Sequence, residues 1–367
     1  MTQSVLRSLL AKYKAVKTNL QREPWSFYDK EAAVRYKFDR DLNWLAEPIV
    51  FHTPFYEAVR NRDFTLGPNF KTLSLNTLDG RIHCNVSFQA YFLKRYLLNT
   101  EETWKLGSAK VFERKGEWYF YLSVSRDVEV PSQGEFTHIE GADRGIRFPV
   151  TLFDGNKTMF PLNGDILQAK RDNYTRLRAE LQSRGTKSAK RRLKKLSGRE
   201  SRWMADVNHQ LSKTLASGSK TGTLLALENL TGVSFSVGNS AKRNRDNRSW
   251  TFYDLEMKLG YKLPLCGSDI VAVSPSYTSQ KCPRCGHTEA KNRDHDKHLF
   301  ECCHCGFRSN DDRIGAINIR YLGMLYNKGV SYPKLTKYNA LSFTEPTKAT
   351  GISEAGMFPA GSSEEYF

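Results

Sequence analysis

The stretch Thr223-Leu-Leu-Ala-Leu-Glu228 decides the fold. Its four consecutive apolar residues, Leu224 to Leu227, are typical of a strand that is covered on both faces. A strand with one solvent-exposed face would alternate apolar and polar residues. An acid at the end of such a strand is costly unless it is solvated, paired or bound to a cation. The stretch therefore predicts a buried strand with a candidate functional carboxylate, Glu228, at its carboxyl end.

Patterns on either side of this strand predict the rest of a mixed sheet. Short runs of alternating residues predict strands, and longer runs with helical periodicity predict helices. The expected strands are 138–142, 148–153, 157–162 and 270–273, and the expected helices are 166–216, with a break at Gly185, 250–263 and 311–326. The order of strands, helix, strand, helix and strand favours an α/β fold.

The two ends of the chain have a different character. Residues 1–65 look mostly helical, and residues 70–130 carry two β-hairpin signatures, with turns at Asp79-Gly80 and Lys115-Gly116. From Lys334 onward Ser, Thr, Gly, Pro and Glu dominate, so this tail is expected to be disordered.

The composition indicates a polyanionic partner. The 367 residues include 56 lysines and arginines against 39 aspartates and glutamates, a formal net charge of +17. Such a surplus favours nucleic acid or an anionic membrane surface as partner. No stretch approaches the roughly 18 consecutive apolar residues that a transmembrane helix needs. The N-terminus has no apolar signal core, so a cytosolic protein is expected.

The positive charge is concentrated between Gln168 and Arg202. This segment has 13 basic residues against three acids, which leaves too few acids to neutralise it internally. A solvated charged face is the alternative, but we favour contact with phosphates. The expected nucleic-acid-binding residues are Lys170, Arg171, Arg176, Arg178, Arg184, Lys187, Lys190, Arg191, Arg192, Lys194, Lys195 and Arg199.

Four cysteines have the spacing of a metal site. Cys282-Pro-Arg-Cys285-Gly and Cys302-Cys-His-Cys305-Gly form a C-x2-C-x16-C-x2-C pattern. Two tight turns that each present two thiolates predict one structural zinc ion with four cysteine ligands, the alternative being free thiols. Cys303 and His304 lie inside a knuckle and are not expected to bind this ion, and His287, His295 and His298 are weaker candidates.

Three acids stand where apolar elements begin or end, namely Asp143, Glu228 and Asp312. Three carboxylates brought together would repel one another, and a pair of Mg²⁺ ions would relieve that repulsion and support phosphodiester hydrolysis. For any one acid alone, a cap, turn or surface role is the more common explanation. Asp311 and Asp312 in particular look like acids at a helix N-terminus.

Five ordered blocks carry a resemblance to a known family. They are Gly141-Ala-Asp-Arg-Gly-Ile146, Leu225-Ala-Leu-Glu-Asn-Leu230, Ser249-Trp-Thr-Phe-Tyr-Asp-Leu255, Tyr277-Thr-Ser-Gln280 and Asp312-Arg-Ile-Gly-Ala-Ile-Asn-Ile319. In this order, with the cysteines between the second and third acids, the chain resembles the TnpB family of transposon-encoded RNA-guided DNA endonucleases, relatives of the type V CRISPR effectors. The blocks lie within about residues 137–322.

The resemblance implies an α/β, RNase H-like (RuvC) nuclease domain with an inserted four-cysteine zinc ribbon, plus an N-terminal wedge-like β-barrel with a helical recognition lobe. It also selects Asp312 over Asp311 as the third acid. The implied ranges are 1–66 for the lobe, 67–136 for the barrel, 137–276 and 310–333 for the nuclease domain, 277–309 for the ribbon and 334–367 for a disordered tail.

The implied cofactors are one structural Zn²⁺, two catalytic Mg²⁺ ions and a guide RNA. The implied partner is double-stranded target DNA and its single strands, with the protein acting in the bacterial cytosol near the nucleoid. Three alternatives stay open: a non-catalytic nucleic-acid-binding regulator, a small type V CRISPR effector, and a transposase that joins DNA ends.

Overall fold

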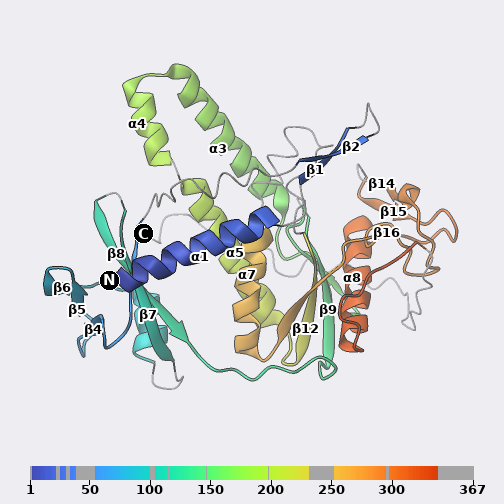
Figure 1. Ribbon diagram of the computed structural model, residues 1–367. Coiled ribbons are helices and arrows are strands. Elements are labelled where there is room, and N and C mark those ends of the chain that lie inside the picture. The colour runs from blue at the N-terminus through green and yellow to red at the C-terminus, as the bar shows by residue number, and fades with distance from the viewer. Residues whose placement is uncertain are drawn as a thin grey trace. The chain divides into compact units, whose positions relative to one another are not determined.

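The computed structural model describes residues 2–21, 25–29, 34–38, 54–99, 104–114, 116–145, 147–196, 198–230, 252–294 and 297–337. The chain divides into two units, Met1–Asp127 and Val128–Phe367, which we describe separately. Figure 1 labels their elements. Among the described residues, no helix combines the length and the apolar character that crossing a membrane requires.

A mixed five-stranded sheet forms the centre of the second unit, in the order β11-β10-β9-β12-β13. Its strands are β9 (His138–Asp143), β10 (Thr151–Phe153), β11 (Thr158–Met159), β12 (Thr223–Glu228) and β13 (Asp269–Val273). Strands β9, β12 and β13 run parallel, while β10 and β11 are antiparallel to their neighbours. All residues of β12 are buried, as its continuous apolar sequence predicts.

Helices cover both faces of β12. Leu225 and Leu227 pack on the face covered by α5 (Arg199–Gly218) and α7 (Phe252–Lys262). Ala226, between them, faces α8 (Asp311–Asn327). Figure 1 shows α5 and α7 on one side of β9 and β12 and α8 on the other. The short 3-10 helix Pro264–Cys266 links α7 to β13.

Glycines bring α8 against the sheet. A Cβ atom on Gly141, in β9, would lie 2.2 Å from the carbonyl oxygen of Ala316 and 2.4 Å from the backbone nitrogen of Arg320. A Cβ on Gly323 would lie 2.8 Å from the Cβ of Ala226. Because backbone atoms cannot swing away as a long side chain can, glycine at position 141 is required for this helix–strand distance.

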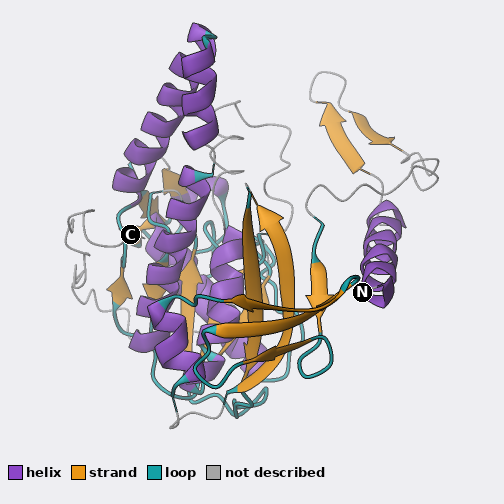
Figure 2. Cartoon of the chain, turned by 90° about the vertical axis from the view of Figure 1, so that its left-hand side faces the viewer, coloured by secondary structure: helices purple, strands orange, loops and turns teal. Residues whose placement is uncertain are grey.

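A helical hairpin projects from the second unit (Figure 2). It consists of α3 (Gly164–Arg184) and α4 (Lys187–Leu196). Gly185, with φ of +62°, ends α3 in the left-handed conformation, which confirms the expected break. A second break, at Gly198 with φ of +79°, precedes α5 and was not predicted.

A small three-stranded sheet lies between β13 and α8 in the chain. Its strands are β14 (Arg293–Asp294), β15 (Leu299–Glu301) and β16 (Arg308–Asn310), and the 3-10 helix Ala290–Asn292 precedes them. Phe300, Cys282 and Cys302 form a small core together with Ile314 of α8. The cysteine-bearing segment is therefore anchored on the helix that begins with Asp311 and Asp312.

The first unit is richer in strands than the sequence suggested. Helix α1 (Thr2–Gln21) agrees with the helical expectation, but the described residues that follow it are strands. They are β1 (Trp25–Asp29), β2 (Val34–Phe38), β3 (Tyr56–Ala58) and β4 (Phe64–Leu66). The expectation of a mostly helical segment 1–66 is therefore wrong beyond residue 21 for the residues that the structure describes.

The predicted hairpins are present downstream. Strand β5 (Thr72–Thr77) pairs with β6 (Gly80–Asn85), and β7 (Lys105–Arg114) pairs with β8 (Glu117–Ser125). The short helix α2 (Ala90–Phe92) and a π-helical turn (Leu93–Leu97) lie between the hairpins. Because β4 pairs with β5 and β3 pairs with β7, the β-rich part begins upstream of the expected boundary at residue 67.

The expected start of the disordered tail at residue 334 is also wrong. Leu335 is 1% exposed and packs against Val273, Ile319 and Leu322. The carbonyl oxygen of Thr336 accepts a hydrogen bond from the buried ammonium group of Lys281. A single apolar residue within a polar segment carries no periodicity, so this anchor was invisible in the sequence. Residues 338–367 lie outside the described part.

Candidate functional site

The three acids singled out in the sequence lie near one another at one end of the central sheet. Asp143 ends β9 and Glu228 ends β12, and these neighbouring parallel strands pair Ala142 with Leu227, so both acids lie at the same level. Asp312 lies in the first turn of α8. Each of the three is at most 8% exposed.

The close approach of α8 brings the acids together. A Cβ on Gly315, one turn after Asp311, would lie 2.3 Å from the Asp143 carboxylate oxygen Oδ2, so Asp143 lies directly against the helix. Burial raises the pKa of Asp143 well above its usual value, and the charges of Glu228 and Asp312 raise it further. The pKa of Glu228 is also raised by burial.

A hydrogen-bond relay orients Glu228. The hydroxyl of Thr278 donates to a Glu228 carboxylate oxygen. Asn318 of α8, fully buried, donates from its side-chain amide to the carbonyl oxygens of Thr278 (2.6 Å) and Lys281 (2.8 Å). The relay links the end of β12 to α8 through the segment that leads into the cysteines.

Two arginines support the acids, and sequence reasoning missed both. The buried Arg144 side chain donates to the backbone carbonyl of Glu228 and, at 3.1 Å, to the carboxylate of Glu256. Arg293, from β14, lies 2.8 Å from Asp311 and 3.6 Å from Asp312. Thr278 and Asn318 belong to the sequence blocks that resemble the family. The resemblance marks their positions but does not say which groups they contact.

Asp311 and Asp312 have different environments. Asp311 is fully buried and pairs with Arg293, with His298 Nδ1 at 3.6 Å from its other oxygen. The pKa of Asp312 is raised by burial and by the charge of Asp311. Arg293 is thus an ion-pair partner of both acids, closer to Asp311 at 2.8 Å than to Asp312 at 3.6 Å, and the charge of Asp312 also raises the pKa of Asp143.

The four cysteines converge on one point. The Sγ atoms of Cys282 and Cys305 lie 3.7 Å apart and those of Cys285 and Cys302 lie 3.5 Å apart. Four sulfurs at about 2.3 Å from a tetrahedral zinc ion would be about 3.8 Å apart, so the set fits the ion closely. Both knuckles close with a hydrogen bond from a glycine N–H, Gly286 to Cys282 and Gly306 to Cys302, each 2.9 Å.

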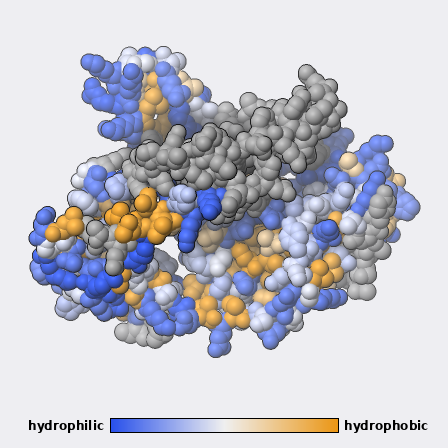
Figure 3. All heavy atoms as spheres, viewed as in Figure 1, coloured by the Kyte–Doolittle hydropathy of each residue, from blue (hydrophilic) through white to orange (hydrophobic). Residues whose placement is uncertain are grey.

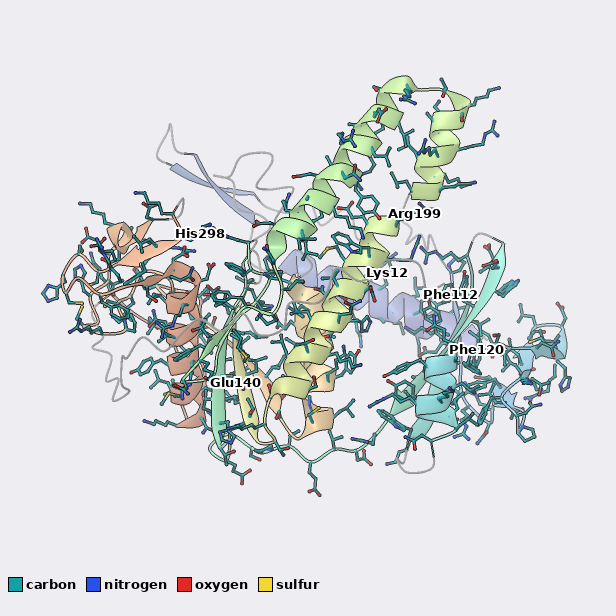
Figure 4. The ribbon with its side chains drawn as sticks, turned by 180° about the vertical axis from the view of Figure 1, so that it is seen from behind. Lys12, Phe112, Phe120, Glu140, Arg199 and His298 are labelled. Carbon is teal, nitrogen blue, oxygen red and sulfur yellow. The ribbon has the colours of Figure 1, made fainter. Side chains whose placement is uncertain are left out.

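The predicted nucleic-acid-binding residues fall into two groups. The six basic residues of α4 are exposed, and no acid pairs with them in the described part of the chain; they are Lys187, Lys190, Arg191, Arg192, Lys194 and Lys195. Figure 3 shows mostly hydrophilic side chains over the projecting hairpin. Arg199 is exposed at the start of α5 (Figure 4).

The remaining candidates are more engaged within the protein. Arg178 pairs with Glu200 and Arg184 with Glu180. Arg176 donates to the side chain of Asn173, and the ammonium group of Lys170 lies 4.6 Å from the ring centre of Trp203. Arg171 is only 3% exposed, so an open phosphate contact for it is wrong. Although α3 is rich in basic residues, the side chain of Arg171 is buried and not part of its exposed surface. The polar, basic sequence of residues 238–248 is compatible with a mobile lid over the acids or with a plain surface loop, and this segment lies outside the described residues.

The sequence is similar to one known family and to several known proteins. Residues 252–319, which include α7, β13, the cysteines and the first half of α8, match the family described as Cas12f1-like, TNB domain. The chain is 29% identical over 223 residues to the CRISPR-associated endodeoxyribonuclease Cas12f1 of Sulfoacidibacillus thermotolerans, covering 56% of this chain and 50% of that protein.

Two further relatives come from outside the Cas12f group. The TnpB-like protein of Methanocaldococcus jannaschii is 29% identical over 59% of this chain and 80% of its own length. InsQ of Escherichia coli, named as a candidate RNA-guided DNA endonuclease, is 27% identical over 62% of this chain and 60% of its own.

Among solved structures, a CRISPR-Cas12f ternary complex matches 59% of this chain and 46% of its own, with a TM-score of 0.41 and 19% identity. The sequence matches span half of the Cas12f1 protein and 60% of InsQ. The chain is thus similar to TnpB-like and Cas12f1 proteins over more than half of its length, and its residues 252–319 match the Cas12f1-like TNB domain.

Proposed function

We propose that this protein is an RNA-guided DNA endonuclease that hydrolyses phosphodiester bonds at a RuvC-like site formed by Asp143, Glu228 and Asp312. The observation that carries the proposal is the convergence of three buried carboxylates from two parallel strand ends and one helix start. The names of the relatives, an endodeoxyribonuclease and a candidate RNA-guided nuclease, support the reaction and the guide.

The donor set fits hard divalent cations. Carboxylate oxygens are the protein ligands that Mg²⁺ prefers. Burial and, after it, neighbouring negative charge raise the pKa of Asp143 and of Asp312, and bound cations would balance that charge. We assign Asp143, Glu228 and Asp312 as the residues that hold Mg²⁺. The chemistry supplied by two bound Mg²⁺ ions would be activation of a water and stabilisation of the leaving oxygen.

The surrounding residues keep the carboxylates in place. Thr278 orients Glu228 through its hydroxyl, and Asn318 holds the Thr278 backbone against α8. Arg144 fixes the backbone at the end of β12, and Arg293 reduces the repulsion between Asp311 and Asp312. Pre-organised side chains of this kind lower the cost of reaching the reactive geometry.

We assign the contacts with guide RNA and target DNA to the exposed lysines and arginines of α4. Their charge would attract phosphates without reading sequence, which fits a protein whose specificity comes from base pairing with a guide. The four-cysteine segment would hold one structural zinc ion, and the two hairpins of the first unit would belong to the wedge-like barrel. The nuclease domain would begin near residue 137 and continue after the ribbon, residues 277–309.

The test is a cleavage assay with the protein purified together with its bound RNA, which is sequenced to identify the guide. Asp143→Asn, Glu228→Gln and Asp312→Asn should each lower Mg²⁺-dependent cleavage by at least about a hundredfold, while RNA binding persists. The control is Glu140→Gln, another buried acid of β9, whose carboxylate accepts from Ser219. Figure 4 places Glu140 toward the end of the sheet away from His298.

The outcome separates the alternatives. Cleavage that survives all three substitutions would rule out this site, and binding without any cleavage would indicate a regulator. Joined products from supplied transposon ends would indicate a transposase.

A further inference from the structure

A second group of potential metal ligands lies on the ribbon, outside the four-cysteine site. The Sγ atom of Cys303 lies 3.2 Å from His287 Nε2 and 3.1 Å from Glu289 Oε2, and these last two atoms are 3.3 Å apart. Three different side chains thus direct one donor atom each toward a common point. The sequence left His287 as a weaker candidate for the four-cysteine ion and assigned neither Glu289 nor Cys303 to a metal.

The ribbon backbone holds the three donors in position. The Cys282 N–H donates to the carbonyl oxygen of His287 at 2.8 Å, which fixes the segment that carries His287 and Glu289. The Cys303 N–H donates at 3.0 Å to the side chain of Asn292, which is 1% exposed and also donates to the carbonyl oxygen of Gln280. The two knuckles are therefore tied together in the geometry that forms the triangle.

The triangle has the size that a tetrahedral ion needs. With metal–sulfur distances of about 2.3 Å and metal–nitrogen or metal–oxygen distances of about 2.0–2.2 Å, neighbouring ligand atoms are separated by about 3.4–3.6 Å. The observed separations of 3.1–3.3 Å require an opening of only a few tenths of an ångström. The side chains of His287 and Glu289 are 34% and 40% exposed, and Cys303 is exposed, so solvent can supply a fourth ligand.

We propose that His287, Glu289 and Cys303 form a second metal site on the ribbon, one that takes a Zn²⁺-class ion with an open fourth position. A thiolate, an imidazole and a carboxylate suit borderline transition metals and not Mg²⁺, which prefers oxygen ligands. A three-ligand set with an accessible fourth position differs from the closed four-cysteine site. The inference stands apart from the proposed nuclease function, since none of the three residues belongs to the acidic cluster.

The experiment counts zinc ions in the full chain. The protein is dialysed to equilibrium against micromolar Zn²⁺, and bound zinc per chain is measured by mass spectrometry. We expect two ions for the unsubstituted protein and one for Cys303→Ser and for His287→Ala. Glu289→Gln, which removes only the charge, should weaken the second ion's binding about tenfold or more. All of these lie on the surface of the ribbon and should leave the four-cysteine ion bound.

A neighbouring histidine provides the matched control. The His304 ring stacks on His287, with ring centres 5.5 Å apart, but contributes no atom to the triangle, so His304→Ala should still bind two ions. A single ion in the unsubstituted chain would mean that the triangle is only a hydrogen-bonded group. Two ions in both Cys303→Ser and His287→Ala would place the second ion elsewhere. Either result overturns the proposal.

Discussion

At the scale of single residues, the site is built from groups that are unfavourable by themselves. Asp143 is buried beside Glu228 and Asp312, and its raised pKa reflects both the loss of hydration and the like charges. Such an arrangement costs stability when no cation is bound. Proteins commonly keep destabilising groups of this kind where function needs them.

This cost leads to a prediction for Asp143→Asn. Removing one of three neighbouring charges should stabilise the metal-free protein. Its free energy of unfolding should rise by about 1 kcal/mol, and its Tm by about 2–4 °C. Added Mg²⁺ should stabilise the unsubstituted protein and not the variant, because a ligand stabilises only the state that binds it. Thermal unfolding with and without Mg²⁺ measures both effects.

The control for that measurement is Asp127→Asn. The Asp127 side chain is 90% exposed and pairs with Lys105, which is also exposed, so this substitution should leave Tm nearly unchanged. A lower Tm for Asp143→Asn in the absence of Mg²⁺ would contradict the repulsion argument.

At the scale of elements, the distance between α8 and β9 decides whether Asp312 reaches Asp143. Gly141→Ala would place a methyl group 2.2 Å from the backbone oxygen of Ala316, so either the helix or the strand has to move. We expect a loss of about 3 kcal/mol in the free energy of unfolding, from overpacking, and a loss of cleavage. Denaturant unfolding and the cleavage assay measure the two effects.

Gly218→Ala is the matched glycine substitution. Gly218 ends α5, and a Cβ there would meet nothing within 4 Å. Alanine is favoured over glycine in a helix by up to about 1 kcal/mol, so this variant should be neutral or slightly more stable. Equal effects of the two substitutions would show that α8 packing is not the cause.

Helix α4 is the element that we expect to contact nucleic acid. Reversing Lys190, Arg191 and Lys194 to glutamate should weaken binding to all sequences alike. It should also reduce the slope of log K against log salt by about 2–3, since each lost phosphate contact contributes about 0.9. Binding is measured over a series of salt concentrations.

Arg178→Gln with Arg184→Gln serves as the comparison on the same hairpin. These two arginines already pair with Glu200 and Glu180, so their removal should change the salt slope less. An unchanged slope after the α4 reversal would locate the nucleic-acid contact on another surface.

At the scale of the whole molecule, the ribbon and the acidic cluster depend on each other. The ribbon supplies Arg293 to Asp311 and Asp312, and Asn318 of α8 holds the segment that precedes Cys282. The ribbon core also packs on Ile314 of α8. Loss of the ribbon fold should therefore disturb Asp312 through the loss of Arg293, although the ribbon contributes cysteines and no acid to the cluster.

Removal of zinc tests this dependence. After chelation, with metal loss verified by mass spectrometry, residues 281–310 should lose hydrogen-exchange protection, because a structural zinc site folds with its metal. The strands of the central sheet should remain protected. Cleavage in added Mg²⁺ should fall although all three acids are present. Unchanged protection and activity in metal-free protein would contradict the four-cysteine assignment.

How much of the structure could be predicted depends on the range over which each signal acts. The run at β12, the hairpin turns and the break at Gly185 are local patterns, and each predicted its element correctly. Short strands such as β3 and β4 carry too few residues for a periodicity, and pairing with β7 and β5 determines them instead. The buried Arg171 and the anchored Leu335 likewise depend on packing partners far away in the chain.

The sequence by itself determined the α/β character, the four cysteines with their zinc-like spacing, and the positions of three acids at element ends. Only the tertiary structure decided that Gly141 and Gly315 bring those acids together, that Arg293 and the Thr278–Asn318 relay support them, and that Cys303 meets His287 and Glu289. The physical reason is that helices and strands depend on the periodicity of residues close together in the sequence. Contacts between side chains far apart in the sequence form only when those elements pack against one another.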